Sequence, residues 1–186
     1  PWVYDLGGRI TSMTMPDGGT TSYAYDDRDR ATSTLYSDGQ LETQEYDGRG
    51  FRTAITMAGD TMEWTYNVMG QVTLQTNADG STIEYEYDAL GRQASITGTM
   101  GIQVHSIGRT YDAGGRLATV TDGVGRSATY YYDNVGNRTQ VDRSNGTHST
   151  WAYDDMNRLT QIDHYDSTGA LDQQFSYTLD ALGSRT

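Results

Sequence analysis

The sequence contains no cysteine, no lysine and only two prolines in 186 residues. Without cysteine, disulfide bonds, thiol nucleophiles and thiolate metal sites are excluded. The apolar runs are far too short to span a bilayer, so we expect neither a membrane segment nor a signal peptide. Only 35% of the residues are hydrophobic, so a conventional core would be thin for this length. The first residue is Pro1 rather than Met, which indicates an excerpt of a longer protein.

What is present favours β-structure and an acidic surface. The chain has 15 Tyr, 22 Gly and, by count, 27 Thr, a composition that argues against disorder. Its net charge of -12 disfavours nucleic acid and anionic membranes as partners. All 13 basic residues are arginine, whose rigid multi-donor fork suits fixed structural positions.

A Tyr-Asp dipeptide followed by Gly and Arg recurs along the whole chain, and we count nine copies. Successive Asp positions, with Asn67 as one of them, are 21, 21, 20, 21, 24, 21, 21 and 26 residues apart. Eight copies are Tyr4-Asp5 with Gly8 and Arg9, Tyr25-Asp26 with Arg30, Tyr46-Asp47 with Gly50 and Arg52, Tyr66-Asn67 with Gly70 and Gln71, Tyr87-Asp88 with Gly91 and Arg92, Tyr111-Asp112 with Gly115 and Arg116, Tyr132-Asp133 with Gly136 and Arg138, and Tyr153-Asp154 with Arg158. The ninth, degenerate copy spans 180–185.

A second turn signal lies about twelve residues after each Asp, as at Asp38-Gly39 and Asp79-Gly80. Each repeat therefore predicts two strands and two turns. The segment 82–87 alternates as a strand does. The segments that leave each Arg place apolar residues one and four positions on, as in Ile10 and Met13, which indicates a bend, a bulge or a strand buried on both faces. The longer intervals, around 98–108 and 163–174, are expected to be looser loops.

The motif has a mechanical interpretation. Asp at the start of a turn accepts hydrogen bonds from backbone N-H groups, Gly takes the left-handed conformation, and Arg reaches a carboxylate or carbonyl of a neighbouring repeat. Each Tyr ring is expected to pack on its counterpart one repeat along. The fourth copy has Asn67 and Gln71, and this joint loss of charge suggests that Asp and Arg interact.

Up to about eighteen strands in one sheet would curl, because each strand adds twist. We therefore expect an all-β fold in which hairpins stack side by side into a curved or spiralling antiparallel sheet, with residues 1–186 forming a single tandem-repeat array. The concave side of such a sheet would be a polar hollow, since large aliphatic side chains are scarce.

These tandem units resemble the RHS/YD-repeat family over essentially the whole chain. The family includes bacterial polymorphic toxins, insecticidal toxin-complex subunits and the teneurins. The resemblance implies β-hairpins wound into a hollow shell that, in bacterial members, contains a C-terminal toxic domain. It also implies a secreted or cell-surface bacterial protein. An Asp-Pro-x-Gly-Leu core segment, where the family cleaves itself, is absent from the sequence.

Catalytic and metal-binding patterns are weak. His105, His148 and His164 lack metal spacing, and no Gly-x-Ser-x-Gly elbow is present. The acidic run 26–29 lacks the glycine of an EF loop, and Glu84 and Glu86 are best interpreted as the solvated face of a strand. We expect no enzyme activity, no cofactor and no metal.

The sequence thus predicts a non-catalytic segment of a β-shell whose partners are a polypeptide cargo and flanking repeats. One alternative is a carbohydrate-binding or adhesive module in which Tyr85, Tyr87 and Tyr131 stack on sugars. Another is a fibrous extracellular protein that associates end to end.

Overall fold

The computed structural model describes residues 1–180, which form seventeen β-strands and no helix. The strands are β1 (Trp2–Tyr4), β2 (Ile10–Thr14), β3 (Thr20–Tyr25), β4 (Ala31–Leu35), β5 (Leu41–Tyr46), β6 (Arg52–Met57), β7 (Asp60–Tyr66), β8 (Val72–Thr76), β9 (Thr82–Tyr87), β10 (Gln93–Met100), β11 (Gln103–Tyr111), β12 (Leu117–Asp122), β13 (Ser127–Tyr132), β14 (Arg138–Arg143), β15 (His148–Tyr153), β16 (Leu159–Tyr165) and β17 (Leu171–Ser176). The ninth copy of the motif lies almost entirely outside the described residues.

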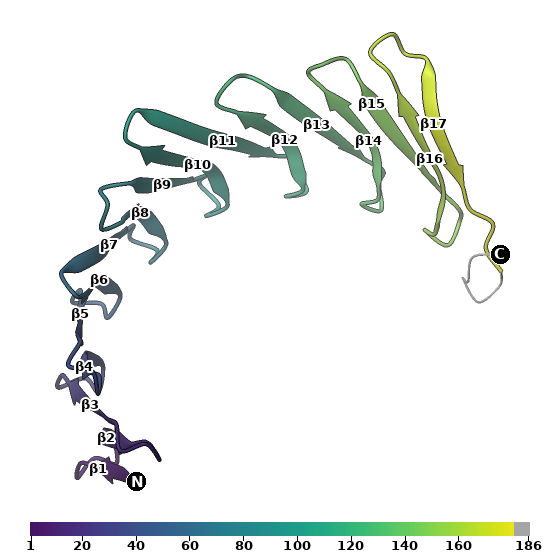
Figure 1. Ribbon diagram of the computed structural model, residues 1–186. Helices are drawn as coiled ribbons and strands as arrows, with labels where there is room; N and C mark the ends of the chain where they lie inside the picture. The colour runs from purple at the N-terminus through teal and green to yellow at the C-terminus, as the bar shows by residue number, and fades with distance from the viewer. Residues whose placement is uncertain (181–186) are drawn as a thin grey trace. The chain divides into compact units, whose positions relative to one another are not determined.

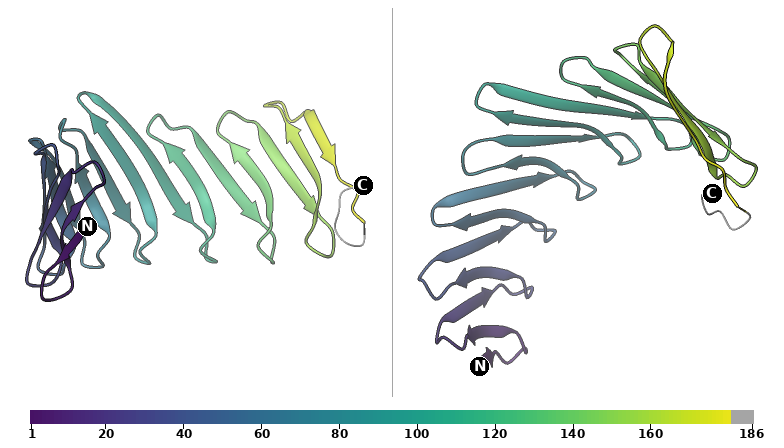
Figure 2. Two further views of the ribbon diagram at one scale, coloured as in Figure 1. Left: turned by 60° about the horizontal axis from the view of Figure 1, so that its bottom comes forward. Right: turned by 45° about the vertical axis from the view of Figure 1, so that its right-hand side comes forward.

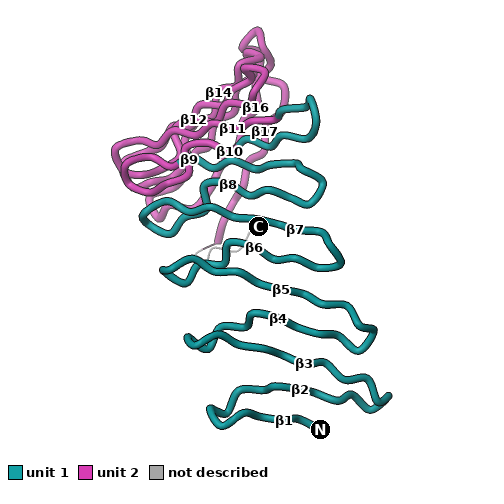
Figure 3. Tube along the Cα trace, turned by 90° about the vertical axis from the view of Figure 1, so that its left-hand side faces the viewer, with its two compact units in different colours: residues 1–86, 97–104 teal, residues 87–96, 105–186 magenta. Residues whose placement is uncertain are grey.

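The chain divides into two compact units (Figure 3). Unit 1 comprises residues 1–86 and 97–104, and unit 2 comprises residues 87–96 and 105 onward. Repeats of the same pitch run through both units.

Within each unit, strands that follow one another in the chain lie side by side and pair antiparallel (Figures 1 and 2). β1 to β9 pair in succession in this way, as do β11 to β17. The predicted all-β fold of laterally stacked hairpins is confirmed.

The turns after each motif tyrosine share one backbone geometry. In the first repeat, Gly8 N-H donates to the Asp5 carbonyl (3.1 Å) and Asp5 N-H donates to the Arg9 carbonyl (2.9 Å). The third loop residue of this turn must be left-handed, and Gly8 has φ of 82°. Where glycine is absent, Asp29 and Asn157 take the position with φ of 62° and 60°. Both belong to the few residue types that tolerate this conformation.

A β-bulge accompanies these turns in both units, as at Tyr4, Tyr25, Tyr111 and Tyr132. This bulge is the alternative, among those left open by the apolar spacing, that the structure shows. Tyr111 pairs with Leu117 and Thr110 with Thr119, so Ala118 is an extra residue. Arg109, on the same face as Tyr111, pairs with Val120. The bulge therefore places Leu117 and Val120 on one face although they are three residues apart.

The expectation that the two longer intervals are loops is wrong. Gly98 lies within β10, and Gly108 within β11, so the extra residues lengthen strands. Asp163 and Gln174 also pair, in β16 and β17. The β-branched neighbours of Gly98 favour extended backbone in β10, and the left-handed Gly101 (φ 58°) supplies the turn between β10 and β11.

Burial is slight. Of the described residues, the buried apolar ones are Ala54 and Val141, and four polar residues are also buried: Thr21, Thr34, Ser149 and Asp163. Hydrogen bonds between strands and contacts between polar side chains must therefore hold the sheet together. Nowhere in residues 1–180 is there a helix long and apolar enough to cross a bilayer.

Candidate functional site

The motif aspartate organises its own turn. Asp112 Oδ1 accepts from the backbone N-H of Arg116 (2.9 Å), and Oδ2 accepts from Arg116 Nε (2.7 Å). The backbone bond from Arg116, followed by its side-chain bond, holds the pKa of Asp112 below its ordinary value. The Asp–Arg interaction suggested by the fourth copy is thus confirmed, within one repeat.

The same arrangement recurs wherever Arg stands four residues after Asp in the motif. For Asp26 it lowers the pKa to about 2, chiefly through the side-chain hydrogen bond from Arg30. The Asp–Arg pairs in motif turns are Asp5–Arg9, Asp26–Arg30, Asp88–Arg92, Asp112–Arg116 and Asp154–Arg158, with the closest N···O distances between 2.6 and 2.7 Å.

The motif arginine also reaches the next repeat. Arg116 Nη1 donates to the Asp133 carbonyl (2.9 Å), and its Cζ lies 4.7 Å from the ring centre of Tyr132. The Tyr132 hydroxyl in turn donates to the carbonyl of Leu117, the residue after Arg116 (2.9 Å). We call this reciprocal contact the Arg–Tyr clamp.

The clamp is repeated through both units. Its arginine and tyrosine come from successive repeats, with Cζ 4.4 to 5.0 Å from the ring centre and the hydroxyl 2.7 to 2.9 Å from the carbonyl. The clamps are Arg9–Tyr25, Arg30–Tyr46, Arg92–Tyr111 and Arg116–Tyr132.

The expectation that motif tyrosines pack on one another is therefore wrong. Successive tyrosines are separated by two strands, roughly 10 Å, whereas stacked rings lie about 4.5–7 Å apart. The guanidinium fills this space instead. A ring contact between aromatic residues does occur at Tyr66, whose partner is Phe51, 5.0 Å away.

Two copies depart from the assignment made from sequence. The repeat pattern predicts Arg52 and Arg138 as motif arginines, but each stands five residues after its Asp rather than four. Phe51 occupies the fourth position after Asp47, and the Asp47 carboxylate pairs with Arg49 (2.9 Å). In the other copy, Asn137 donates its side-chain amide to Asp133 Oδ2 (3.0 Å).

The residue at the fifth position faces a side chain two residues before the next motif tyrosine. Arg52 lies over Trp64 with Cζ 5.0 Å from the ring centre, and Arg138 lies over Trp151 at 4.1 Å. Gln93 occupies the same position and accepts from Arg109 (2.6 Å). Sequence analysis missed these contacts, although the shared spacing of the arginines and tryptophans was a usable signal.

The fourth copy shows a neutral version of the turn. Asn67 Oδ1 accepts from Gln71 N (3.0 Å), and Asn67 Nδ2 donates to Gln71 Oε1 (3.0 Å). Asn and Gln therefore reproduce the hydrogen bonds of Asp and Arg without charge.

A serine–histidine contact that sequence analysis missed lies in unit 2. Ser149 Oγ is 2.8 Å from His164 Nδ1 and also accepts from Arg143 Nη1 (3.1 Å). Ser149 is fully buried, with none of its surface exposed. A hydroxyl closed off in this way cannot attack a substrate, so the contact is structural.

The other candidate residues are dispersed. His105 is exposed, whereas His148 stacks on Tyr165 at 4.3 Å between ring centres. In the part of the chain that the structure describes, no three His, Asp or Glu side chains gather to hold a metal ion.

The tyrosines proposed to stack on sugars do not form one row. Tyr85 and Tyr87 are half-buried and share a face of β9. Tyr131 is 45% exposed and faces away from Tyr132, so it does not join the row of motif tyrosines.

The repeating turns and clamps define a tandem β-repeat protein of the YD type, and comparisons with known proteins give the same result. The teneurin YD-shell model matches residues 2–105, and the RHS repeat model matches residues 111–148. The first match covers more than half of the sequence, and the chain belongs to the teneurin YD-shell family. The resemblance noted from the motif is confirmed. None of the curated proteins matches the sequence.

Several solved structures share the fold. TcdB2-TccC3 without its hypervariable C-terminal region is 13% identical, with a TM-score of 0.70, and the match covers 97% of this chain. The Photorhabdus luminescens Tc holotoxin pore, with a substitution in TccC3, is 16% identical with a TM-score of 0.67 and 89% of this chain covered. A further structure of TcdB2-TccC3 is 18% identical with a TM-score of 0.53, and the match covers 99% of this chain. This chain spans only 10% to 12% of the length of those chains.

Proposed function

We propose that this chain is a segment of the wall of a YD-repeat β-shell that encloses a polypeptide cargo, such as a C-terminal toxin domain. The observation that carries this proposal is the Arg–Tyr clamp, which joins one repeat to the next through side chains as well as backbone. Membership of the YD-shell family and the shared fold of the Tc toxin structures support it.

The polar character of the chain suits such a wall. Most side chains on both faces of the sheet are half-buried or exposed, and the net charge is -12. A hydrophilic, acidic lining offers little apolar surface to a partly folded cargo, so the cargo is enclosed without forming strong hydrophobic contacts with the wall. We infer that the segment performs no catalysis and functions in a secreted or cell-surface bacterial protein.

Protease protection tests the proposal. The full protein encoded by the reading frame that contains this sequence would be expressed in two clamp-deficient forms, Arg92→Ala with Arg116→Ala, and Tyr111→Phe with Tyr132→Phe. We expect the segment C-terminal to the repeats to resist proteolysis in the unaltered protein and to be cut faster in both variants.

The matched control is Arg126→Ala. Arg126 also pairs with an aspartate, Asp122 at 2.6 Å, but at the opposite end of a hairpin. It should leave protection unchanged. If the C-terminal segment is cut as fast in the unaltered protein as in the two clamp-deficient variants, that result would contradict enclosure.

Sugar binding is a second proposal, and the exposure of the Tyr131 ring beside a carboxylate is the observation that favours it. Its ring is exposed, and a hydrogen bond to Asp142 raises the pKa of its hydroxyl. An aromatic face beside a carboxylate can stack on a sugar and accept from its hydroxyls. Loss of glycan-array signal on Tyr131→Ala, with Tyr85→Ala and Tyr87→Ala compared, would support this function, and an array without binders would exclude it.

A further inference from the structure

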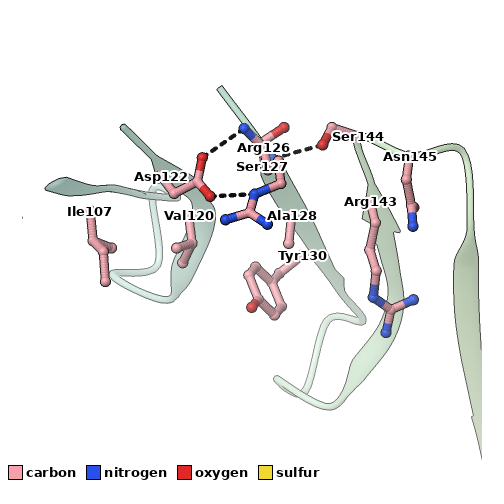
Figure 4. Close-up of a pocket in the computed structure, with 10 residues that line it drawn as sticks. All are labelled: Ile107, Val120, Asp122, Arg126, Ser127, Ala128, Tyr130, Arg143, Ser144 and Asn145. Carbon is pink, nitrogen blue, oxygen red and sulfur yellow. Dashed lines mark hydrogen bonds and ion pairs between the residues drawn. The ribbon is translucent and has the colours of Figure 1, made fainter. Parts of the chain in front are cut away.

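A hollow of about 370 Å³ opens on one face of unit 2, beside strands β11 to β14 (Figure 4). Its apolar lining includes Ile107, Val120, Ala128 and Tyr130. The volume lies within the range of about 300–1,000 Å³ that is usual for ligand sites.

A small side chain explains why the hollow exists. Ala128 stands four residues before the motif residue Tyr132, and the equivalent positions in two earlier repeats are Ile83 and Ile107. Alanine leaves the space that isoleucine would fill. Its neighbour on the next strand is Arg143, whose long side chain borders the hollow instead of covering its floor (Figure 4).

Three hydrogen-bond donors border the apolar floor. Arg143 is exposed and donates to Ser149 Oγ, and no carboxylate within residues 1–180 forms an ion pair with it. Asn145 uses its Oδ1 to accept from Thr147, which leaves its Nδ2 donors available. The Tyr130 hydroxyl has no acceptor among the described residues.

The remaining guanidinium beside the hollow is already neutralised. Arg126 Nε lies 2.6 Å from Asp122 Oδ2, and its backbone N-H also donates to that carboxylate (2.8 Å). Arg143 is therefore the cation that is open to a ligand.

We propose that this hollow binds a peptide segment in which a carboxylate stands next to an apolar or aromatic side chain. The apolar group would lie on Ile107, Val120 and Ala128, and the carboxylate would accept from Arg143 and Asn145. A single carboxylate suits the site better than a polyanion, since the chain has a net charge of -12. This site does not depend on the shell proposal.

Nuclear magnetic resonance titration of the 186-residue chain tests the proposal with small probes. N-acetyl-phenylalanine presents a chain-end carboxylate, N-acetyl-Asp-Phe-amide presents a side-chain carboxylate, and N-acetyl-phenylalanine amide presents none. We expect at least one acidic probe to shift the methyl signals of Ile107 and Val120, and the neutral amide to bind at least about fivefold more weakly. Comparing the two acidic probes shows which carboxylate is preferred.

Two variants separate the apolar floor from the charge. Ala128→Ile fills the hollow with the residue found at the equivalent positions of two other repeats, Ile83 and Ile107, and we expect it to abolish binding while the melting temperature stays the same or rises. Arg143→Gln should weaken binding at least about fivefold. The matched control is Arg28→Gln in unit 1, which removes the same charge from an exposed arginine that donates to the Gly48 carbonyl (2.7 Å).

Several results would overturn the proposal. These are no shift with either acidic probe up to roughly 20 mM, equal affinity for the neutral amide, unchanged binding to Ala128→Ile, or the same shifts with acetate alone. An equal loss of affinity in Arg28→Gln and Arg143→Gln would also overturn it, because net charge and not the site would then explain binding.

Discussion

The guanidinium of Arg116 lies over the ring of Tyr132, and the Tyr132 hydroxyl donates to the carbonyl of Leu117, the residue next to Arg116. Each residue thus secures the other's repeat: the arginine covers the ring, and the ring's hydroxyl satisfies the backbone beside the arginine. This contact replaces part of what a hydrophobic core supplies in other folds.

Removing the clamp hydroxyl should destabilise the chain, because the Leu117 carbonyl loses its donor. We expect Tyr132→Phe to lower the free energy of unfolding by about 1 kcal/mol. Tyr130→Phe is the matched control two residues away, and it should change that free energy by less than about 0.3 kcal/mol, since its hydroxyl has no hydrogen-bond partner within residues 1–180. Urea denaturation followed by circular dichroism measures both. Equal effects would show that the hydroxyl bond contributes nothing.

The Asp–Arg pair should be replaceable by the neutral pair that the chain already contains. Asp112→Asn or Arg116→Gln alone leaves a charged group with a poorly matched partner, so each single variant should melt several degrees lower. The double variant copies Asn67 and Gln71, and its melting temperature should lie above that of at least one single variant. Strictly additive losses in this double-mutant cycle would mean that the two side chains do not interact.

The fold could be predicted from sequence because its signals are local and repeated. The period, the turn residues and the alternation in segments such as 82–87 all point to hairpins, and one repeat reinforces the next. The three-residue spacing of Leu117 and Val120 indicated a bulge as one possibility. It could not locate the bulge, because a bend or a strand buried on both faces would also fit that spacing. The lengthening of β10 was missed because Gly98 suggested a loop, whereas its neighbours favour a strand.

The contacts between repeats were predicted only in outline. The sequence showed that Asp and Arg belong together, but not that the arginine inserts between tyrosines, because that depends on the two-strand separation of the rings. Phe51 and Asn137 were overlooked as substitutes because Arg52 and Arg138, one residue further on, completed the expected pattern. The hollow at Ala128 arises where alanine stands in place of the larger residues Ile83 and Ile107 of two other repeats, and only the strand register reveals its neighbours.

Replacing the left-handed turn glycine should destabilise the chain more at Gly70, because the preceding repeat has Phe51 in place of the motif arginine. A Cβ on Gly115 (φ 80°) would lie 3.6 Å from Arg92 Nη1, so Gly115→Ala has mainly the backbone penalty of roughly 1–2 kcal/mol. A Cβ on Gly70 would lie 2.5 Å from Phe51 Cζ, so Gly70→Ala should be clearly more destabilising. The excess should disappear in the Phe51→Arg background, which restores the motif. Chemical denaturation of the four variants measures this, and an excess that persists would exclude the Phe51 contact as its cause.

Acid should unfold the chain through the motif aspartates. Their hydrogen bonds lower the folded-state pKa values of Asp5, Asp26, Asp88, Asp112 and Asp154, and that of Asp26 falls from its ordinary 3.8 to about 2. The unfolded chain therefore binds protons at a higher pH than the folded chain does. The stabilisation from these groups is complete above the ordinary value and is lost as the pH falls toward the folded values.

We therefore expect the contribution of these aspartates to the free energy of unfolding to stay constant from pH 7 to about pH 5. Below about pH 4 the free energy of unfolding should fall steeply. Asp26→Asn removes one of these proton sites and should reduce the slope near pH 3, where it is steepest, by up to about one proton per molecule. Denaturant titrations at a series of pH values measure that slope. A variant with the unchanged slope would show that the Asp26 carboxylate is no more acidic in the folded chain than in the unfolded one, and that its bonds to Arg30 are too weak to favour ionisation.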